Sequence, residues 1–349
     1  MKIFIDNLTV GSIKVNLNPI QRIIKDEGYS LSFPQNVRLM YELANSPENS
    51  DYCALPFMWN DYVDNGKLGL AKEIKDKAEK AGKKLIIFSS GDSTANIPFK
   101  DSIIIQSSCY QSRDGINGIQ ILSIPSFIED YIQLYCNGVE NYRQKKQIPV
   151  VGFCGQGRGS LFDYVRRHLI LSIKKLAFRT HITKWEPPVI EPTLFRKRVL
   201  QRVRANSGIE SNFLVRSKYR AGYRIKKKDP FHISRLEFVK NILESDYTVC
   251  MRGGGNFSVR FYETLALGRI PIFINSDCVL PFDKIMNYKD YMIWVEQDEL
   301  SYLPEKIIDF HRSLSDSQFT ELQKACRSLW KEYFTKNGFF KHLPEALKV

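Results

Sequence analysis

The sequence lacks the long apolar runs and paired cysteines that mark membrane-spanning and disulfide-rich proteins. Spanning a bilayer takes about 18 consecutive apolar residues, and no run in the 349-residue chain approaches that length. The first ten residues carry Asp6 and do not have the layout of a signal peptide. The seven cysteines are odd in number and form no C-x-x-C pair, which argues against a zinc or disulfide framework. We therefore expect a cytoplasmic protein, with room for a peripheral contact with the inner face of an anionic membrane.

Several motifs of well-known enzyme classes are also missing. The chain has no Walker A pattern, no H-E-x-x-H, no G-x-S-x-G, and no pair of aspartates two positions apart that could hold a divalent metal against a diphosphate. These absences disfavour an NTPase, a zinc hydrolase and a metal-dependent transferase. We expect neither a resident metal nor a cofactor.

Positive charge is concentrated in one part of the chain. The net charge is +13, and residues 196–228 hold twelve Lys/Arg against Glu210 alone, so this stretch carries +11 of the excess. Such a concentration suits phosphates, whether of a nucleotide diphosphate, an anionic membrane or a nucleic acid. The alternative is a solvated basic helix face.

Short apolar segments alternate with helical ones, which is typical of a parallel α/β sheet. The alternation stops in a polar, basic stretch at 138–148 and then starts again. With 43% hydrophobic residues and this length, two domains are expected: an acceptor-side α/β domain over 1–146, and a nucleotide-sugar-binding α/β domain with C-terminal helices over 147–349. Strands are expected at 2–5, 52–57, 84–89, 102–105, 120–124, 149–154, 247–251, 270–274 and 291–295, and helices at 66–82, 160–175 and 257–267.

Two further segments differ in character. Residues 180–230 contain four prolines and no clear periodicity, which predicts loops attached to the second sheet. Residues 300–334 have a helical pattern. The turn at 155–159 follows a strand and opens a helix, but position 160 is Ser where a dinucleotide-binding fingerprint needs Gly. This turn is therefore a weak nicotinamide site, and it directs Arg158 toward the space between the two sheets.

The most informative segment runs from Tyr247 to Ile274. It reads as a buried strand, three glycines that let the backbone approach a ligand, and a helix whose start is marked by Asn256 or Ser258. A helix N-terminus beside Arg252 and Arg260 is an anion site. Arginine can grip a phosphate, and a carboxylate one turn deeper, Glu263, can accept hydrogen bonds from a ribose diol. The alternative is a glycine-rich turn with a surface Arg–Glu pair.

The stretch 245–282 resembles the signature of exostosin-like glycosyltransferases, in their shorter bacterial form. The resemblance rests on Cys-Met-Arg-Gly, on Asn-Phe-Ser-Val-Arg-Phe-Tyr-Glu-Thr-Leu and on Gly-Arg-Ile-Pro-Ile-Phe-Ile-Asn-Ser-Asp-Cys-Val-Leu-Pro-Phe. It implies a GT-B fold, with two Rossmann-like domains facing across a cleft, and inverting, metal-independent transfer from a nucleotide sugar. Together with the anion site above, it gives these expected donor-binding residues: Arg158, Arg216, Arg220, Arg252, Gly253, Asn256, Ser258, Arg260 and Glu263.

The expected function is sugar transfer from a nucleotide-diphosphate sugar, with a UDP-sugar favoured, to a saccharide or lipid-linked saccharide acceptor, in surface polysaccharide or glycan synthesis. A fucosyltransferase-like enzyme that uses a GDP-sugar is the nearest alternative. A non-catalytic glycan-binding protein would also fit the fold. Nucleic-acid binding is less favoured, because the basic stretch carries few aromatics for base stacking beyond Tyr219 and Tyr223.

A catalytic base is expected from the first domain. None of the five histidines precedes residue 168, so the role falls to a carboxylate. The strand at 84–89 runs into the polar turn Ser90-Gly91-Asp92-Ser93, at the sheet edge where ligands of α/β proteins lie. Asp92 is the candidate, with Asp61 and Asp64 as rivals. The alternative is that Asp92 only caps a turn.

Overall fold

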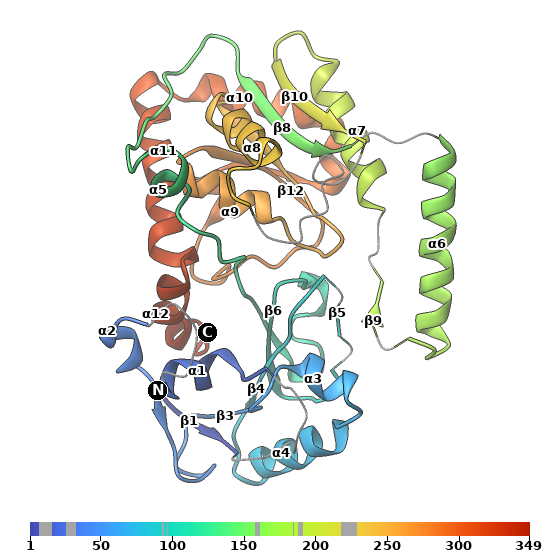
Figure 1. Ribbon diagram of the computed structural model, residues 1–349, viewed down its shortest axis with the longest axis vertical. Helices are drawn as coiled ribbons and strands as arrows, with labels where there is room; N and C mark the ends of the chain where they lie inside the picture. Colours follow the sequence, from blue (N-terminus) through green and yellow to red (C-terminus); the bar gives the residue numbers. More distant parts are fainter. Residues whose placement is uncertain are drawn as a thin grey trace.

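The chain forms two parallel β-sheets, each flanked by helices, that lie one above the other in Figure 1. The computed structural model describes residues 1–6, 16–25, 33–92, 94–95, 97–157, 161–183, 185–187, 191–217 and 229–349. Both sheets consist of parallel strands only, which confirms the α/β fold class expected from the alternating pattern.

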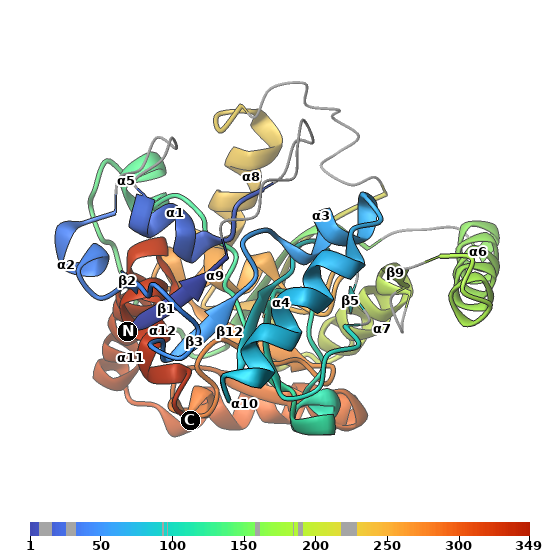
Figure 2. The same cartoon turned by 90° about the horizontal axis from the view of Figure 1, so that it is seen from below.

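The first sheet has six strands in the order β2-β1-β3-β4-β6-β7. They are β1 (Lys2–Ile5), β2 (Glu42–Leu43), β3 (Tyr52–Ala54), β4 (Leu85–Phe88), β6 (Ser102–Gln106) and β7 (Gln120–Ser123). The helices of this half are α1 (Pro19–Lys25), α2 (Gln35–Arg38), α3 (Trp59–Asp64) and α4 (Leu68–Lys80). Helices α3 and α4 lie together beside this sheet in Figure 2.

Alternate residues of β4 serve two separate cores. Leu85 and Ile87 pack in a cluster with Ile74 of α4, whereas Ile86 and Phe88 belong to the cluster that contains Ile20 of α1. Every side chain of the strand is buried. A strand buried on both faces has a continuous apolar sequence, as the run Leu-Ile-Ile-Phe does.

The second sheet has five strands in the order β10-β8-β11-β12-β13. They are β8 (Val150–Gln156), β10 (Glu210–Arg216), β11 (Tyr247–Cys250), β12 (Ile270–Asn275) and β13 (Ile293–Glu296). The other elements are α5 (Tyr131–Tyr135), α6 (Leu161–Arg179), α7 (Pro192–Arg204), α8 (Ile233–Leu243), α9 (Val259–Ala266) and α10 (Leu303–Ser313), and a short antiparallel pair joins β5 (Thr94–Ala95) to β9 (Trp185–Glu186).

The strand order of the second sheet identifies where a ligand would lie. The chain passes from β8 outward to β10 and then returns to the other side of β8 as β11. The direction of winding therefore reverses between β8 and β11. In doubly wound sheets, ligands bind beyond the carboxyl ends of the strands at such a reversal.

The C-terminal helices tie the two sheets together. Helix α11 (Asp316–Leu329) continues through a π-helical turn, Trp330–Phe334, to α12 (Lys336–Ala346), and Figure 1 shows them in red running from the upper sheet to the lower one. Phe340 of α12 meets Phe33 edge to face at 5.5 Å, and its carbonyl accepts a hydrogen bond from the Tyr41 hydroxyl.

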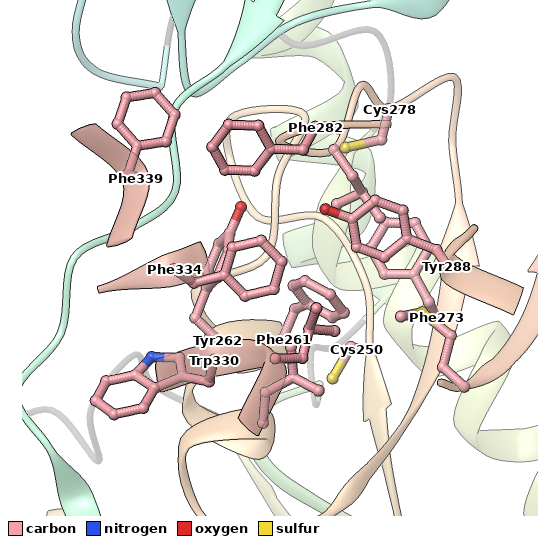
Figure 3. Packing of buried hydrophobic residues seen from close by; sticks show 14 of the residues in the cluster. Cys250, Phe261, Tyr262, Phe273, Cys278, Phe282, Tyr288, Trp330, Phe334 and Phe339 are labelled. Carbon is pink, nitrogen blue, oxygen red and sulfur yellow. The ribbon is translucent and has the colours of Figure 1, made fainter. Parts of the chain in front are cut away.

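An aromatic cluster joins these helices to the second sheet (Figure 3). The rings of Tyr262 and Phe334 are 5.5 Å apart, and Tyr288 stacks on Phe334 from another side. Phe282 continues the cluster to Phe339 of α12, with 5.4 Å between ring centroids. Helix α9, which carries Arg260 and Glu263, is therefore packed against a layer of aromatic side chains.

The prediction of loops over 180–230 is wrong at α7, at β10 and at the short strand β9. Helix α7 begins at Pro192, and Glu191 caps it by accepting a hydrogen bond from the Leu194 amide at 2.7 Å. Proline is favoured in the first turn of a helix, where its missing N–H costs nothing, so Pro192 marks a helix start and not a loop. Strand β10 was also unexpected, because it is an edge strand without a fully apolar run. The helical prediction for 300–334 is confirmed.

The division at residue 146 stays a prediction: α5 precedes it yet packs with Val239 and Ile242 of α8, and α12 follows it yet packs on the first sheet. Within the described parts of the chain, no helix is long and apolar enough to cross a membrane.

Helix α12 makes a prediction possible for the stability of the first half. Phe340 is 1% exposed, so Phe340→Ala should leave a cavity and lower the free energy of unfolding by about 3–5 kcal/mol. Urea denaturation measures this change. The exposed Lys348, eight positions further on, is the control, and Lys348→Ala should have no comparable effect. Equal stability of the two variants would contradict the role of α12.

Candidate functional site

The carboxyl ends of strands from both sheets meet at one place. The segment after β6 contacts the loops after β11 and β12: Tyr110 forms a β-bridge with Cys278, and the Gln111 amide donates to the Asp277 carbonyl at 3.0 Å. The carboxylate of Asp277 accepts from the backbone amide of Ser112 at 2.9 Å and from its hydroxyl at 2.6 Å. The two sheets are thus joined at the edges where the sequence analysis predicts a ligand.

Asn256 is the centre of this junction. It is fully buried, its amide nitrogen donates to the carbonyls of Cys109 at 2.8 Å and Asp277 at 2.9 Å, and its amide oxygen accepts from the Ser276 hydroxyl. Its backbone N–H donates to the Ser108 hydroxyl at 3.0 Å. Both ends of the side chain are engaged within the protein, which differs from the donor-binding role expected from the sequence. The geometry makes Asn256 a residue that holds the glycine turn in place.

The glycine turn packs directly against Asp92. A Cβ added to Gly254 would lie 3.1 Å from the Asp92 carboxylate, and one added to Gly255 would lie 3.0 Å from the Asp92 Cα. A side chain at position 255 would therefore press on the Asp92 backbone, and one at position 254 on the Asp92 carboxylate. Glycine here permits close approach between two segments of the protein, in addition to any approach of a ligand.

The turn that carries Asp92 is held by Asn60, near the start of α3. The Asn60 side-chain amide donates to the Ser90 carbonyl at 3.0 Å and accepts from the Ser90 backbone amide at 2.9 Å. Asp92 is exposed beyond this clamp. Of the rivals, Asp61 is occupied by both nitrogens of Asn16, at 2.7 and 3.2 Å, and Asp64 is an exposed residue at the end of α3.

Arg260 lies at the winding reversal of the second sheet. Its guanidinium donates to the carbonyl of Cys154, at the end of β8, at 2.8 Å and to that of Val249 in β11 at 3.5 Å. It stacks on Phe153 with 4.2 Å between its Cζ and the ring centroid. A Cβ on Gly155 would come within 2.8 Å of this guanidinium, so the absence of a side chain there makes the position available. Burial lowers the pKa of Arg260, which means that the surroundings disfavour its charge.

Arg252 is the second arginine at this edge. It is 3% exposed, donates to the Tyr110 hydroxyl at 3.3 Å, and lies over that ring. In Arg252 and in Arg260 the Nε is buried without a hydrogen-bond partner. Among the residues that the structure describes, neither arginine forms an ion pair. Buried charges in proteins are normally paired, so these two cations are suited to an anion from outside.

Glu263 faces a different partner from the one expected. It is 5% exposed, and its Oε1 accepts from Arg235 Nη1 at 2.7 Å and from the Tyr131 hydroxyl at 2.8 Å. Burial and the adjacent carboxylate raise the pKa of Tyr131, so this phenol stays a donor. Glu263 therefore lies deeper than a surface Arg–Glu pair would, within a charged group that closes the back of the site.

The other expected donor-binding residues differ in their surroundings. Arg216 ends β10 and pairs with Glu237 of α8. Gly253 follows Arg252, whose carbonyl accepts from Arg196 at 3.3 Å. Ser258 is the N-cap of α9, as the sequence indicated, although its side chain makes no capping hydrogen bond. Arg158 and Arg220 lie outside the described residues.

Sequence reasoning missed three residues of this region: Arg235, Arg196 and Asn60. Arg235 and Arg196 come from α8 and α7, helices that were not expected, so nothing marked which of many basic residues would turn inward. Nothing in the sequence distinguishes Asn60 from its neighbour Asp61 as the residue that holds the turn. Only the packing of α3 against the turn after β4 identifies it.

The arrangement offers the kinds of group that binding a diphosphate and removing a proton from a second substrate would need. Arg252, Arg260 and the uncapped N-terminus of α9 provide positive charge on one side, and Asp92 provides an exposed carboxylate on the other. Within the described residues, no group of three or more His, Cys, Asp or Glu side chains is placed to hold a metal ion.

Comparison with known proteins finds a distant and partial similarity to exostosins. Exostosin-1 of Drosophila melanogaster is 28% identical over 107 residues, which are 31% of this chain and 14% of that protein. The Exostosin-1 homolog of Caenorhabditis elegans is 26% identical over 107 residues, covering 31% and 27%. Human Exostosin-2 is 22% identical over 99 residues, covering 28% and 13%. The match therefore spans between about one eighth and one quarter of these relatives. No family model matches the chain.

Solved structures of glycosyltransferases align with most of the chain at low similarity. The UDP complex of Anabaena HepE gives a TM-score of 0.39 at 12% identity and covers 99% of both chains. A glycosyltransferase from Rickettsia africae gives 0.38 at 14% identity, covering 99% of this chain and 89% of that one. TarM gives 0.38 at 10% identity, covering 85% and 54%. The fold class follows from the two parallel sheets and their strand orders.

The unpaired state of Arg252 can be tested by comparing two buried arginines. Arg327 is 2% exposed and makes two hydrogen bonds to Asp130, at 2.7 and 2.6 Å, so Arg327→Met should lower the free energy of unfolding by about 3 kcal/mol. Arg252→Met removes a cation without an ion-pair partner, and the ligand-free protein should be equally or more stable. Thermal denaturation of both variants measures the contrast. Similar losses in both would show that Arg252 has a structural partner.

Proposed function

We propose that this protein is a glycosyltransferase of the GT-B type that transfers a sugar from a nucleoside-diphosphate sugar to a saccharide acceptor. The second sheet would bind the donor and the first would supply the base. Following the exostosin resemblance, a UDP-sugar is the proposed donor, and the transfer is proposed to invert the anomeric carbon and to need no metal ion.

One observation carries this proposal: two arginines with a buried, unpartnered Nε lie at the carboxyl edge of the second sheet. Arg260 bridges β8 and β11 at the winding reversal, and Arg252 lies two residues after the end of β11. A diphosphate would supply the anion that both lack and would accept charge-assisted hydrogen bonds. The similarity to exostosins falls on about 31% of the chain and supports the same class of reaction.

The nucleoside would extend from the diphosphate toward α8 and α9. Both hydrogen bonds to Glu263 end on its Oε1, so Oε2 is the atom proposed to accept a ribose hydroxyl. Arg235 would hold the carboxylate in this orientation. Because Arg235 already compensates its charge, Glu263 would accept a hydrogen bond from the neutral ribose hydroxyl without needing a second cation.

The proposed chemical step uses Asp92 as the base. Its carboxylate takes the proton of an acceptor hydroxyl, whose oxygen attacks the anomeric carbon opposite the diphosphate. The bond from that carbon to the phosphate oxygen breaks, and the diphosphate leaves with the electron pair. Arg252, Arg260 and the α9 N-terminus stabilise the charge that develops, and each preorganised contact of this kind is worth about 3 kcal/mol. One displacement inverts the anomeric configuration.

Donor binding tests the role of Arg260. Arg260→Ala should weaken the binding of UDP by more than about tenfold, because a hydrogen bond to a charged group contributes roughly 1.5–3 kcal/mol. Calorimetry with UDP, GDP, CMP and dTDP would also identify the nucleobase that the donor site prefers. Arg198→Ala is the matched control, since Arg198 is exposed on α7 and the same charge is lost. If Arg260→Ala binds UDP as tightly as the wild type does, Arg260 is not part of the donor site.

Turnover tests the role of Asp92. Asp92→Asn should lower kcat by about 10²–10⁴ while UDP affinity stays unchanged, as expected for loss of a general base. Asp64→Asn, which changes another exposed carboxylate of the same half, should retain activity.

Metal independence is tested by running the assays in the presence of EDTA, where the wild type should remain active. Normal turnover of Asp92→Asn would exclude it as the base, and an enzyme that works only after Mn²⁺ is added would contradict metal independence. A protein that binds UDP without any turnover would be a glycan-binding relative.

A further inference from the structure

Helix α6 stands at the outer edge of the molecule in both Figure 1 and Figure 2. It runs over Leu161–Arg179 and is the longest helix that the structure describes. Arg167 ties it to the start of α7, by a hydrogen bond to the Thr193 hydroxyl at 3.0 Å and an ion pair with Glu191 at 3.6 Å. The strand that follows the helix, β9, pairs with β5 of the first half.

The outward face of α6 is apolar. Large apolar side chains recur at three- and four-residue spacing, which places them on one side of a helix. Their exposed fractions are far above those of core residues: Phe162 76%, Val165 56%, Leu169 60%, Ile173 58% and Leu176 62%, with Ile170 43% beside them. Leu171, on the opposite side, is 8% exposed. The helix thus presents its hydrophobic stripe away from the protein.

The helix that carries this stripe is positively charged. Arg166, Arg167, Lys174, Lys175 and Arg179 give the helix five cationic residues, against Asp163 as the single acid. An exposed apolar stripe bordered by Lys and Arg is the pattern of helices that lie in the interface of anionic bilayers. Burying the stripe in the acyl region would remove the exposed apolar area, and the cations would reach the headgroups.

We propose that α6 docks the protein on the surface of an anionic lipid bilayer. A second copy of the chain would cover the stripe less well, because an isologous contact sets the same face against itself. The positively charged helices of the two copies would then face one another, whereas an anionic bilayer supplies headgroups of the opposite charge. No described helix can span a bilayer, so α6 lies along the surface.

This surface is independent of the proposed transferase activity. Vesicle binding needs neither donor nor acceptor, and the proposed site residues are on other elements. The apolar side chains that would insert belong to α6 and not to the basic stretch 196–228.

Vesicle flotation of the full chain tests the proposal. We expect binding to vesicles of equal parts phosphatidylglycerol and phosphatidylcholine at low salt, weaker binding at high salt, and little binding to phosphatidylcholine alone. The double variant Leu169→Glu, Ile173→Glu should bind at least tenfold more weakly. Leu39→Glu with Val139→Glu is the matched control, since Leu39 is 77% and Val139 66% exposed away from α6. This control adds the same two negative charges and should bind within about twofold of the wild type.

A second readout locates the contact. Phe162→Trp keeps an apolar side chain at an exposed position, and its fluorescence should shift to the blue and be quenched by brominated lipid when vesicles are added. Leu39→Trp should show neither change.

Three outcomes would overturn the proposal. They are wild-type protein that does not bind the anionic vesicles, equal binding by the two double variants, and fluorescence of Phe162→Trp that vesicles leave unchanged. If α6 instead covers its stripe with a second copy, sedimentation velocity would show a dimer that Leu169→Glu, Ile173→Glu dissociates, without binding to vesicles.

Discussion

The buried amide of Asn256 is the contact on which the arrangement of the two sheets depends. It holds the carbonyls of Cys109 and Asp277, one from each half of the chain, and thereby fixes the turn that contains three glycines. Because glycines 254 and 255 have no side chains, that turn can lie against Asp92. A buried amide with all its partners in place specifies one geometry, since leaving any of these groups unpaired would cost about 1–3 kcal/mol. The relation between the candidate base and the anion site follows from this one junction.

The same junction keeps positive charge where the protein itself does not neutralise it. Arg327 shows how this chain pairs a buried arginine when the role is structural, with Asp130 and Glu140 around it and the Ala266 carbonyl below. Arg252 and Arg260 have aromatic rings and carbonyls instead. These neighbours position a guanidinium without cancelling its charge, which costs stability in the free protein. Such a cost is typical of functional sites, where a ligand completes what the fold leaves open.

Sequence alone predicted the parts of this structure that depend on local pattern. Apolar runs such as Leu85–Phe88 and Tyr247–Cys250 have the signature of buried parallel strands, and the segment 252–263 carried its arginines, glycines and helix start in one contiguous stretch. What it could not predict depends on tertiary partners. Pro192 by itself is compatible with a loop, and only the cap from Glu191 makes it a helix start. Asn256 has the pattern of a ligand contact, but its amide lies between the carbonyls of Cys109 and Asp277. Arg235 was one cation among many before α8 placed it on Glu263. The outward direction of the α6 stripe depends on which side the body occupies, which periodicity does not give.

Hydrogen exchange with and without UDP tests most directly whether the unpaired arginines form a donor site. A bound diphosphate would accept hydrogen bonds from the backbone at the start of α9, and the account predicts slower exchange over residues 252–260, with α6 unchanged. Slower exchange that falls only in other segments, or no change at a UDP concentration that saturates binding in calorimetry, would contradict the account.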